Sequence, residues 1–150
     1  MRVLENSEVE RALYLRSLNK CFPEWGDERL YEWAFDRQPH GAPKSDIMML
    51  QEEGTVLAGS AVSYREVVPA SGVAVKAGIM TGSWTLPEAR GRGCFTRIIH
   101  ESIRFSRQRG CGLLLAFVTE ENASCRQLIR AGASAAHSRY LILPAESGAK

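Results

Sequence analysis

The stretch from Phe95 to Arg109 carries the clearest periodic pattern in the chain, because apolar residues recur there at the spacing of one helix face. The apolar side is formed by Phe95, Ile98, Ile99, Ser102, Ile103 and Phe105, and the polar side by Arg97, His100, Glu101, Arg104 and Gln108. This pattern predicts an amphipathic helix ended by Gly110. The continuous apolar run that follows, Leu113 to Val118, predicts a strand buried on both faces.

Between residues 46 and 86 the pattern is typical of strands. An apolar run from Ile47 to Gln51, a turn at Glu53-Gly54 and an alternating stretch from Thr55 to Val68 predict a hairpin. One face of its second strand is formed by Val56, Ala58, Ser60, Val62 and Tyr64. A turn at 69–72 leads into a long third strand, Val73 to Leu86. Its Gly78 and Gly82 mark a bulge or the close approach of another backbone.

Capping residues predict helices at both ends of the chain. Ser7 and Glu10 form a capping box that opens a helix through Lys20, and Asp27 caps a shorter second helix. A final helix, Asn122 to Arg130, turns Cys125, Leu128 and Ile129 inward, and Arg139 to Leu143 forms a last strand. The expected order is two helices, three strands, then a strand-helix-strand crossover with parallel strands, which gives an α+β fold.

Composition predicts one domain over residues 1–150, with 45% hydrophobic and 24% charged residues. The net charge of +2 argues against nucleic acid as a partner, although six arginines between residues 90 and 109 suit a phosphate-bearing small ligand. No apolar run approaches ~18 residues, and the first residues are acidic, so we expect a cytoplasmic protein without membrane contact. The four cysteines are widely spaced, which predicts free thiols and no metal site.

The segment "TLPEARGRGCF", residues 85 to 95, joins the third strand to the long helix. A turn that presents successive N–H groups ahead of a helix forms an anion site, because these donors have no partner in the helix. Gly91, Arg92, Gly93, Cys94 and Phe95 supply the N–H groups, and Arg90 or Arg92 adds charge. The spacing fits neither the mononucleotide P-loop nor the dinucleotide fingerprint. A plain strand-to-helix turn is the alternative.

Together with "EENASCRQLIRAGA" after the next strand, this loop resembles the GNAT superfamily of acyl-CoA-dependent N-acyltransferases. The loop matches at Thr85, Pro87, Arg90, Gly91, Arg92 and Gly93, and the later helix at Asn122, Leu128 and Gly132. The resemblance implies a sandwich-like fold with a mixed, mostly antiparallel sheet, one central parallel crossover and helices on both faces. It also implies acetyl-CoA as co-substrate, in a cleft between the third strand and the strand at 113–118. Asn122 and the backbone near Ser83, Trp84 and Thr85 would contact it.

Two departures from the family pattern leave an alternative open. In many members a tyrosine seven residues after the helix-opening Asn122 protonates the departing thiolate, but Ile129 stands there. The chain is also short for the family's two further strands after Gly132, so a terminal strand is missing or comes from a neighbouring subunit in a homodimer. Both departures favour the alternative of a weak or inactive acyl-CoA-binding regulatory module.

The first interpretation is an N-acetyltransferase in which a small-molecule or peptide amine attacks the thioester directly. Glu66 and Glu120 are candidate general bases near the cleft; the alternative is that both are ordinary solvated surface charges. Tyr140 is a candidate general acid; the alternative is that its ring packs in the structure with only the hydroxyl exposed. By the family resemblance, the aromatic residues Trp25, Tyr31 and Trp33 line the acceptor pocket. The alternative is that these side chains pack two short helices into the protein core. Acidic residues beside them favour a cationic acceptor: Glu24, Asp27, Glu32 and Asp36.

Overall fold

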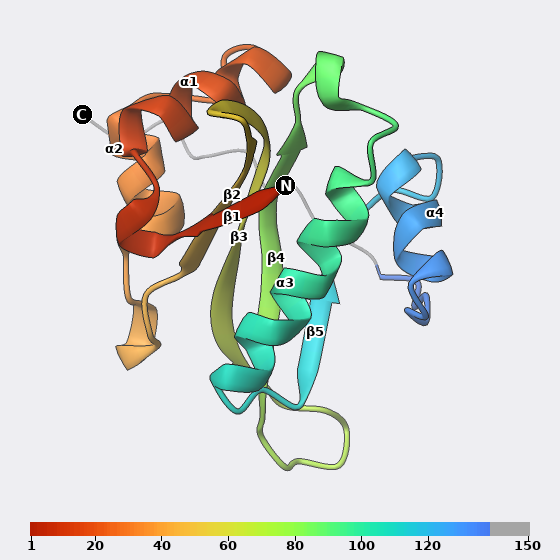
Figure 1. Ribbon diagram of the computed structural model, residues 1–150. Helices are drawn as coiled ribbons and strands as arrows, with labels where there is room; N and C mark the ends of the chain where they lie inside the picture. The colour runs from red at the N-terminus through yellow and green to blue at the C-terminus, as the bar shows by residue number, and fades with distance from the viewer. Residues whose placement is uncertain (139–150) are drawn as a thin grey trace, which may run out of the picture.

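The computed structural model describes residues 1–138 and is built around a five-stranded sheet in the order β1-β2-β3-β4-β5 (Figure 1). The strands are β1 (Arg2–Glu5), β2 (Asp46–Glu52), β3 (Thr55–Val67), β4 (Val75–Thr85) and β5 (Leu113–Ala116). Neighbours from β1 to β4 are antiparallel, and β4 and β5 are parallel. The expected mixed, mostly antiparallel α+β architecture with one parallel crossover is confirmed.

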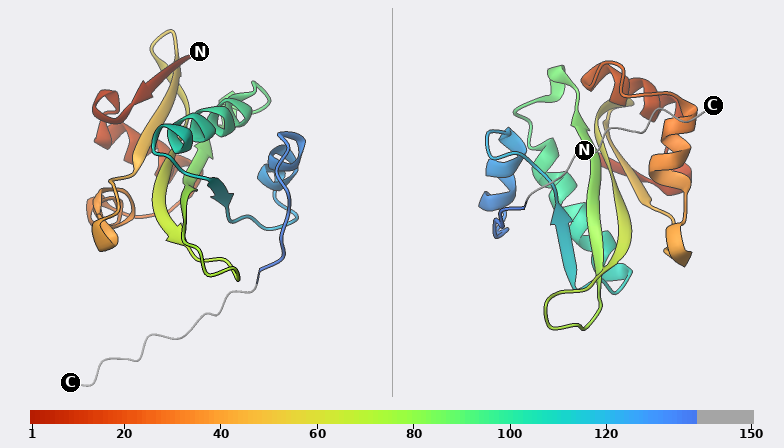
Figure 2. Two further views of the ribbon diagram at one scale, coloured as in Figure 1. Left: turned by 90° about the horizontal axis from the view of Figure 1, so that it is seen from below. Right: turned by 180° about the vertical axis from the view of Figure 1, so that it is seen from behind.

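Helices cover both faces of the sheet (Figures 1 and 2). They are α1 (Arg11–Cys21), α2 (Glu28–Tyr31), α3 (Cys94–Gln108) and α4 (Ala123–Arg130). α3 packs on β3 and β4 from one side, and α1 packs on the same strands from the other. Within residues 1–138, none of these helices is long and apolar enough to cross a membrane.

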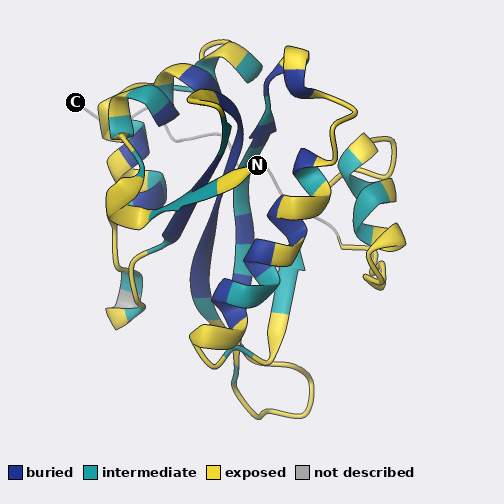
Figure 3. Cartoon of the chain, in the orientation of Figure 1, coloured by how far each residue is buried: buried dark blue, intermediate teal, exposed yellow. Residues whose placement is uncertain are grey.

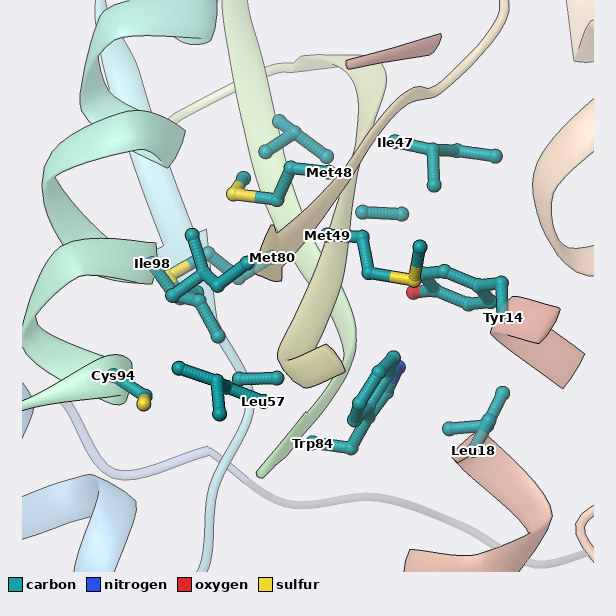
Figure 4. Close-up of a cluster of buried hydrophobic side chains, with 14 of the residues drawn as sticks. Tyr14, Leu18, Ile47, Met48, Met49, Leu57, Met80, Trp84, Cys94 and Ile98 are labelled. Atoms are coloured by element: carbon teal, nitrogen blue, oxygen red, sulfur yellow. The ribbon is translucent and has the colours of Figure 1, made fainter. Parts of the chain in front are cut away.

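The core has two layers, one on each side of the sheet (Figure 4). On the α3 side, Met80 lies against Ile98; on the α1 side, Tyr14 packs edge-to-face on Trp84, with ring centroids 5.5 Å apart. The two layers follow from strand geometry, since successive side chains point to opposite faces. Burial is deepest in β2, β3 and β4 and declines toward β5 and α4 (Figure 3).

The N-terminus differs from the sequence-based expectation. Residues 2–5 form β1, which pairs with β2, where only helices were expected. The capping box lies at Glu5 and Glu8, two residues before the predicted pair Ser7 and Glu10. It caps a short 3-10 turn, Asn6–Glu8, and α1 begins only at Arg11. Pairing with β2 half-buries Val3 and Leu4. The strand β1 was not predicted, because it is stabilised by pairing with a strand distant in the sequence, and the local spacing of residues gives no sign of that pairing. The cap of α2 by Asp27 is confirmed, with Leu30 N–H donating to its carboxylate at 3.1 Å.

Three expectations about burial are also wrong. β3 is buried on both faces over residues 56–64, because α3 covers one side and α1 the other. β5 is half-buried instead of buried on both faces, since within residues 1–138 it pairs with β4 alone. Ile129 points outward from α4 with 47% of its surface exposed. The predicted last strand, Arg139 to Leu143, lies outside the described residues.

Candidate functional site

A cleft opens where β4 and β5 stop pairing. The parallel ladder ends at Met80 and Ala116, and beyond this pair lies a cavity of about 880 Å³. Its walls are the end of β4, the loop from Ala89 to Thr96, the residues after β5, the start of α4 and the end of α1. Sequence reasoning placed the cleft between these two strands. It did not find Phe22 or Phe117, because the end of α1 and the end of β5 meet only in the folded chain.

A β-bulge in β4 shapes the floor of the cleft. Gly59 pairs with Trp84 and Ala61 with Thr81, so Gly82 and Ser83 together stand opposite the single residue Ser60. Gly82 has a φ of +57°, a left-handed backbone that glycine adopts without strain. A bulge leaves one residue of the strand without a ladder partner, which frees backbone groups for other contacts. The bulge expected at Gly78 or Gly82 is therefore located at Gly82.

The glycine-rich loop presents a row of backbone donors at the end of the cleft. Gly91 and Gly93 have φ of +77° and +76°, and Gly93 is the N-cap residue directly before α3. The N–H of Arg90 donates to Pro87 and that of Arg97 to Gly93. Between these two bonds, the N–H groups of residues 91–96 have no protein acceptor within residues 1–138. Donors of this kind before a 15-residue helix attract an anion.

The two loop arginines lie in different surroundings. Arg90 lines the cleft, next to the row of N–H groups. Arg92 does not line it and forms an ion pair with Glu52 at the end of β2. Glu88, before the loop, pairs with Lys20 of α1 at 2.7 Å. Positive potential at the end of the cleft formed by the glycine-rich loop therefore comes mainly from Arg90 and the α3 N-terminus.

Two thiols also line the cleft, and both are held in the neutral form. Burial raises the pKa of Cys21, and burial likewise raises that of Cys94, although nearby arginines act in the opposite direction. The Cys94 thiol donates to the carbonyl of Ala89 at 3.7 Å. A neutral thiol is a poor nucleophile. All four cysteines are free, as expected from their spacing.

The structure describes two of the three candidate acid–base residues, Glu66 and Glu120, and neither lines the cleft. Glu66 pairs in register with Lys76 near the far end of the β3–β4 hairpin, six residues along β3 from Ser60, so its expected position at the cleft is wrong. Glu120 is exposed and its carboxylate lies 3.2 Å from His137 Nδ1, two residues beyond the cleft residue Val118. Tyr140 lies outside the described residues.

The three aromatic residues proposed for the acceptor pocket separate. Trp25 lines the cleft and stacks on Phe35, with ring centroids 5.7 Å apart. Tyr31 is a core residue instead, and its burial raises its pKa to about 12. Trp33 is 58% exposed, with the Arg37 guanidinium over its ring. The structure thus supports one of the three as a wall residue.

The acidic residues near α2 do not face the cleft. Glu28, Glu32 and Asp36 all pair with Arg11 of α1. Asp27 is the cap of α2. The expectation that acidic residues beside the acceptor pocket attract a cation is therefore wrong for all four residues that it named, because none of them lines the cleft: Glu24, Asp27, Glu32 and Asp36.

Other predicted contact residues do line the cleft. Ser83, Trp84, Thr85, Gly91, Gly93, Cys94, Phe95 and Asn122 are all in its wall. The Asn122 side chain accepts from the Ser124 N–H at 3.0 Å and so caps α4. Gln127 and Leu128 of α4 line the cleft, whereas Ile129 does not. Within residues 1–138, no group of histidine, cysteine or acidic side chains could hold a metal ion.

The model of the acetyltransferase (GNAT) family matches residues 11–133 of the chain. Among curated proteins, none has a sequence that matches it. An acetyltransferase from Trypanosoma brucei superposes with a TM-score of 0.69 at 18% identity, over 96% of this chain and 99% of that one.

Two further structures of similar fold contain CoA derivatives. AAC(6')-Iy, in complex with the bisubstrate analog CoA-S-monomethyl-acetylneamine, gives a TM-score of 0.70 at 16% identity over 97% of this chain and 99% of that one. A predicted acetyltransferase from Clostridium acetobutylicum, with acetyl-CoA, gives a TM-score of 0.55 at 16% identity. This match covers 66% of this chain and 63% of that one. At sequence identities this low, the structural similarity establishes a shared fold alone.

Proposed function

The chain belongs to the acetyltransferase (GNAT) family, and we propose that it transfers an acetyl group from acetyl-CoA to the amine of a small molecule or peptide. The observation that carries this proposal is the continuity of the cleft. It runs from the row of N–H groups at residues 91–95, along the end of β4, to the bulge at Gly82 and Ser83.

Acetyl-CoA lies along this cleft with its pyrophosphate on the loop. The N–H groups of residues 91–95 and the Arg90 guanidinium bind the phosphate oxygens, since backbone donors at a helix N-terminus favour negative charge. The amides of the pantetheine arm pair with the backbone of β4 at Ser83 to Thr85, where β5 no longer occupies the edge. This places the thioester at the bulge.

The reaction is direct attack of the amine nitrogen on the thioester carbon. A C–N bond forms, the carbonyl electrons move to oxygen, and collapse of this intermediate breaks the C–S bond, releasing CoA thiolate and one proton from the amine. A backbone N–H freed at the bulge donates to the oxyanion, a contact worth ~3 to 4 kcal/mol when pre-organised. The neutral thiols of Cys21 and Cys94 favour this route over an acyl-cysteine intermediate.

Proton transfer is the most demanding part of this reaction. An alkylammonium has a pKa about three units above neutral pH, so its deprotonation costs roughly 4 kcal/mol. We propose Glu120 as the carboxylate that assists and Tyr140 as the donor to the thiolate. A CoA thiol resembles cysteine, with a pKa near ~8.5, so departure as thiolate loses only about one to two units at neutral pH.

The exposed position of Ile129 favours one alternative, a weak or inactive acyl-CoA-binding module that regulates a partner. Ile129 cannot donate a proton, and its side chain points away from the cleft. The two functions share CoA binding and differ in turnover. Release of free thiol from acetyl-CoA, measured with a broad panel of amines, separates them: the transferase predicts release with at least one amine, and the regulatory module predicts tight binding with none.

The loop assignment has a direct test in Gly93→Glu. We expect this variant to bind CoA at least ~100-fold more weakly by calorimetry, a loss of about 2.7 kcal/mol, because a carboxylate would stand where a phosphate approaches the backbone. Gly72→Glu is the matched control. Gly72 has a φ of +80° against +76° for Gly93, and neither glycine has an atom near its missing Cβ.

The two substitutions therefore introduce the same charge and a similar backbone strain, roughly 1 to 2 kcal/mol, at different places. Gly72→Glu is expected to bind CoA as the unaltered protein does. If the two variants bound CoA equally, the loop would be a plain turn and the assignment of the phosphate site would be wrong.

A further inference from the structure

Two serine side chains meet across the bulge. The hydroxyl oxygens of Ser60 in β3 and Ser83 in β4 are 2.7 Å apart. Ser60 is completely buried beneath α3, and Ser83 is half-buried and lines the cleft. A buried hydroxyl without a hydrogen bond costs roughly 1 to 3 kcal/mol, so this short contact is the reason that Ser60 is tolerated there.

The geometry of this hydrogen bond allows either hydroxyl to be the donor. A hydroxyl has one proton to donate and two lone pairs. The other acceptor within reach of Ser60 is the carbonyl of Ala61, at the long distance of 3.5 Å. We assign Ser60 as the donor, because Ser83 is the nearer of its two acceptors. Within residues 1–138, Ser83 has no other side-chain partner, so its own proton remains available to a group in the cleft.

We propose that the Ser83 hydroxyl donates a hydrogen bond to the thioester carbonyl oxygen as it becomes an oxyanion, and that Ser60 positions it. This proposal rests on the proposed acetyl transfer. Ser83 keeps its proton throughout. The carbonyl electron pair moves to oxygen as the C–N bond forms and returns as the C–S bond breaks. The hydroxyl and the backbone N–H freed by the bulge act on the same oxygen.

The bulge explains how this serine reaches the site. Without the extra residue, Ser83 would fall on the same face of β4 as Thr81, toward α1. The extra residue reverses the alternation, so Ser83 stands opposite Ser60 on the α3 side, where Met80 also lies. A polar side chain is thus brought to the place at which the strands separate.

The test is steady-state kinetics of Ser83→Ala with acetyl-CoA and an amine that the unaltered protein accepts. We expect kcat to fall by ~10²-fold or more, the range for one oxyanion donor, while KM for acetyl-CoA stays within a few-fold. Ser83→Thr retains a hydroxyl and is expected to recover most of kcat. Ser60→Ala leaves Ser83 in place without its anchor, so a smaller fall in kcat, ~10-fold, is expected, again without a change in KM.

Ser63→Ala is the matched control. Ser63 and Thr81 form a second pair of hydroxyls across the same strands, 3.2 Å apart, and neither lines the cleft. This variant is expected to keep kcat. The proposal is overturned if Ser83→Ala and Ser63→Ala have equal kcat, or if the loss in Ser83→Ala is entirely in KM. Absence of turnover in the unaltered protein would overturn the proposed function itself, and this proposal with it.

Discussion

Asp46 shows how one residue fixes the site from a distance. Its carboxylate accepts two hydrogen bonds from Arg109 at 2.9 Å, one from the Tyr64 hydroxyl at 2.6 Å and one from the Asn6 side chain at 3.0 Å. Burial raises the pKa of Asp46, but these donors outweigh it and hold that pKa below its usual value. Asp46 thereby ties the C-terminus of α3 to β2, and the other end of α3 follows the glycine-rich loop of the cleft.

Asp46→Asn should lower stability by about 1.5 to 3 kcal/mol at pH 7, the range for hydrogen bonds to a charged group. Because the folded-state pKa is depressed, the stabilisation by Asp46 is fully present above its unfolded pKa of ~3.9 and is lost as pH falls through the lower folded value. Denaturant unfolding from pH 7 to pH 2 checks this. The difference in stability between the two proteins should begin to shrink below about pH 4 and disappear below the folded-state pKa of Asp46. A difference that stays constant over the whole range would contradict this role of Asp46.

Among the elements, α3 is held unusually close to β4. A Cβ added to Gly78 would lie 2.2 Å from the Ser106 hydroxyl oxygen and 3.1 Å from Val62. The Ser106 hydroxyl is itself buried without a partner among the described residues. The missing side chain at Gly78 therefore sets how closely α3 approaches β4 at this point.

Gly78→Ala should destabilise the protein by about 1 to 3 kcal/mol, as overpacking of a dense core does. Ser106→Ala removes the oxygen that a Cβ at residue 78 would meet. Since this hydroxyl is buried without a partner among the described residues, the single substitution should be neutral or stabilising. The double variant should be more stable than the sum of the two single effects predicts, since the residues share one contact. If the changes in thermal stability of the two single variants simply add in the double variant, Gly78 does not limit the distance between α3 and β4.

Elements with strong local patterns could be predicted from the sequence, and the others could not. α3 was predicted to within one residue at each end, because its apolar spacing and Gly110 are local signals. β1 was missed and β5 was expected to be too deeply buried, since both depend on which strands lie beside them. Burial of β3 on both faces likewise reflects the docking of α1 and α3 and not its alternating sequence.

Across the chain, the end of the cleft formed by the glycine-rich loop could be predicted from the sequence, and the opposite end could not. Residues 90–95 are contiguous, so their glycines and the following helix are visible in the sequence. The other walls come from segments far apart in the chain: the end of α1, the bulge opposite Ser60 and the residues after β5. Trp25 was correctly placed in the cleft wall, whereas Glu66 was not, because strand register alone decides which end of β3 faces the cleft.

Amide NMR of the ¹⁵N-labelled chain can test residue by residue our proposal that residues 91–95 bind the pyrophosphate of an acyl-CoA. Titration with CoA is compared with titration by pantetheine, which has the thiol arm but no pyrophosphate. We expect CoA to shift the amide resonances of Gly91, Gly93, Cys94 and Phe95 strongly. Pantetheine should shift those of Ser83 to Thr85 while leaving the loop unchanged. Equal shifts of the loop amides by both ligands, or none with CoA, would contradict this proposal.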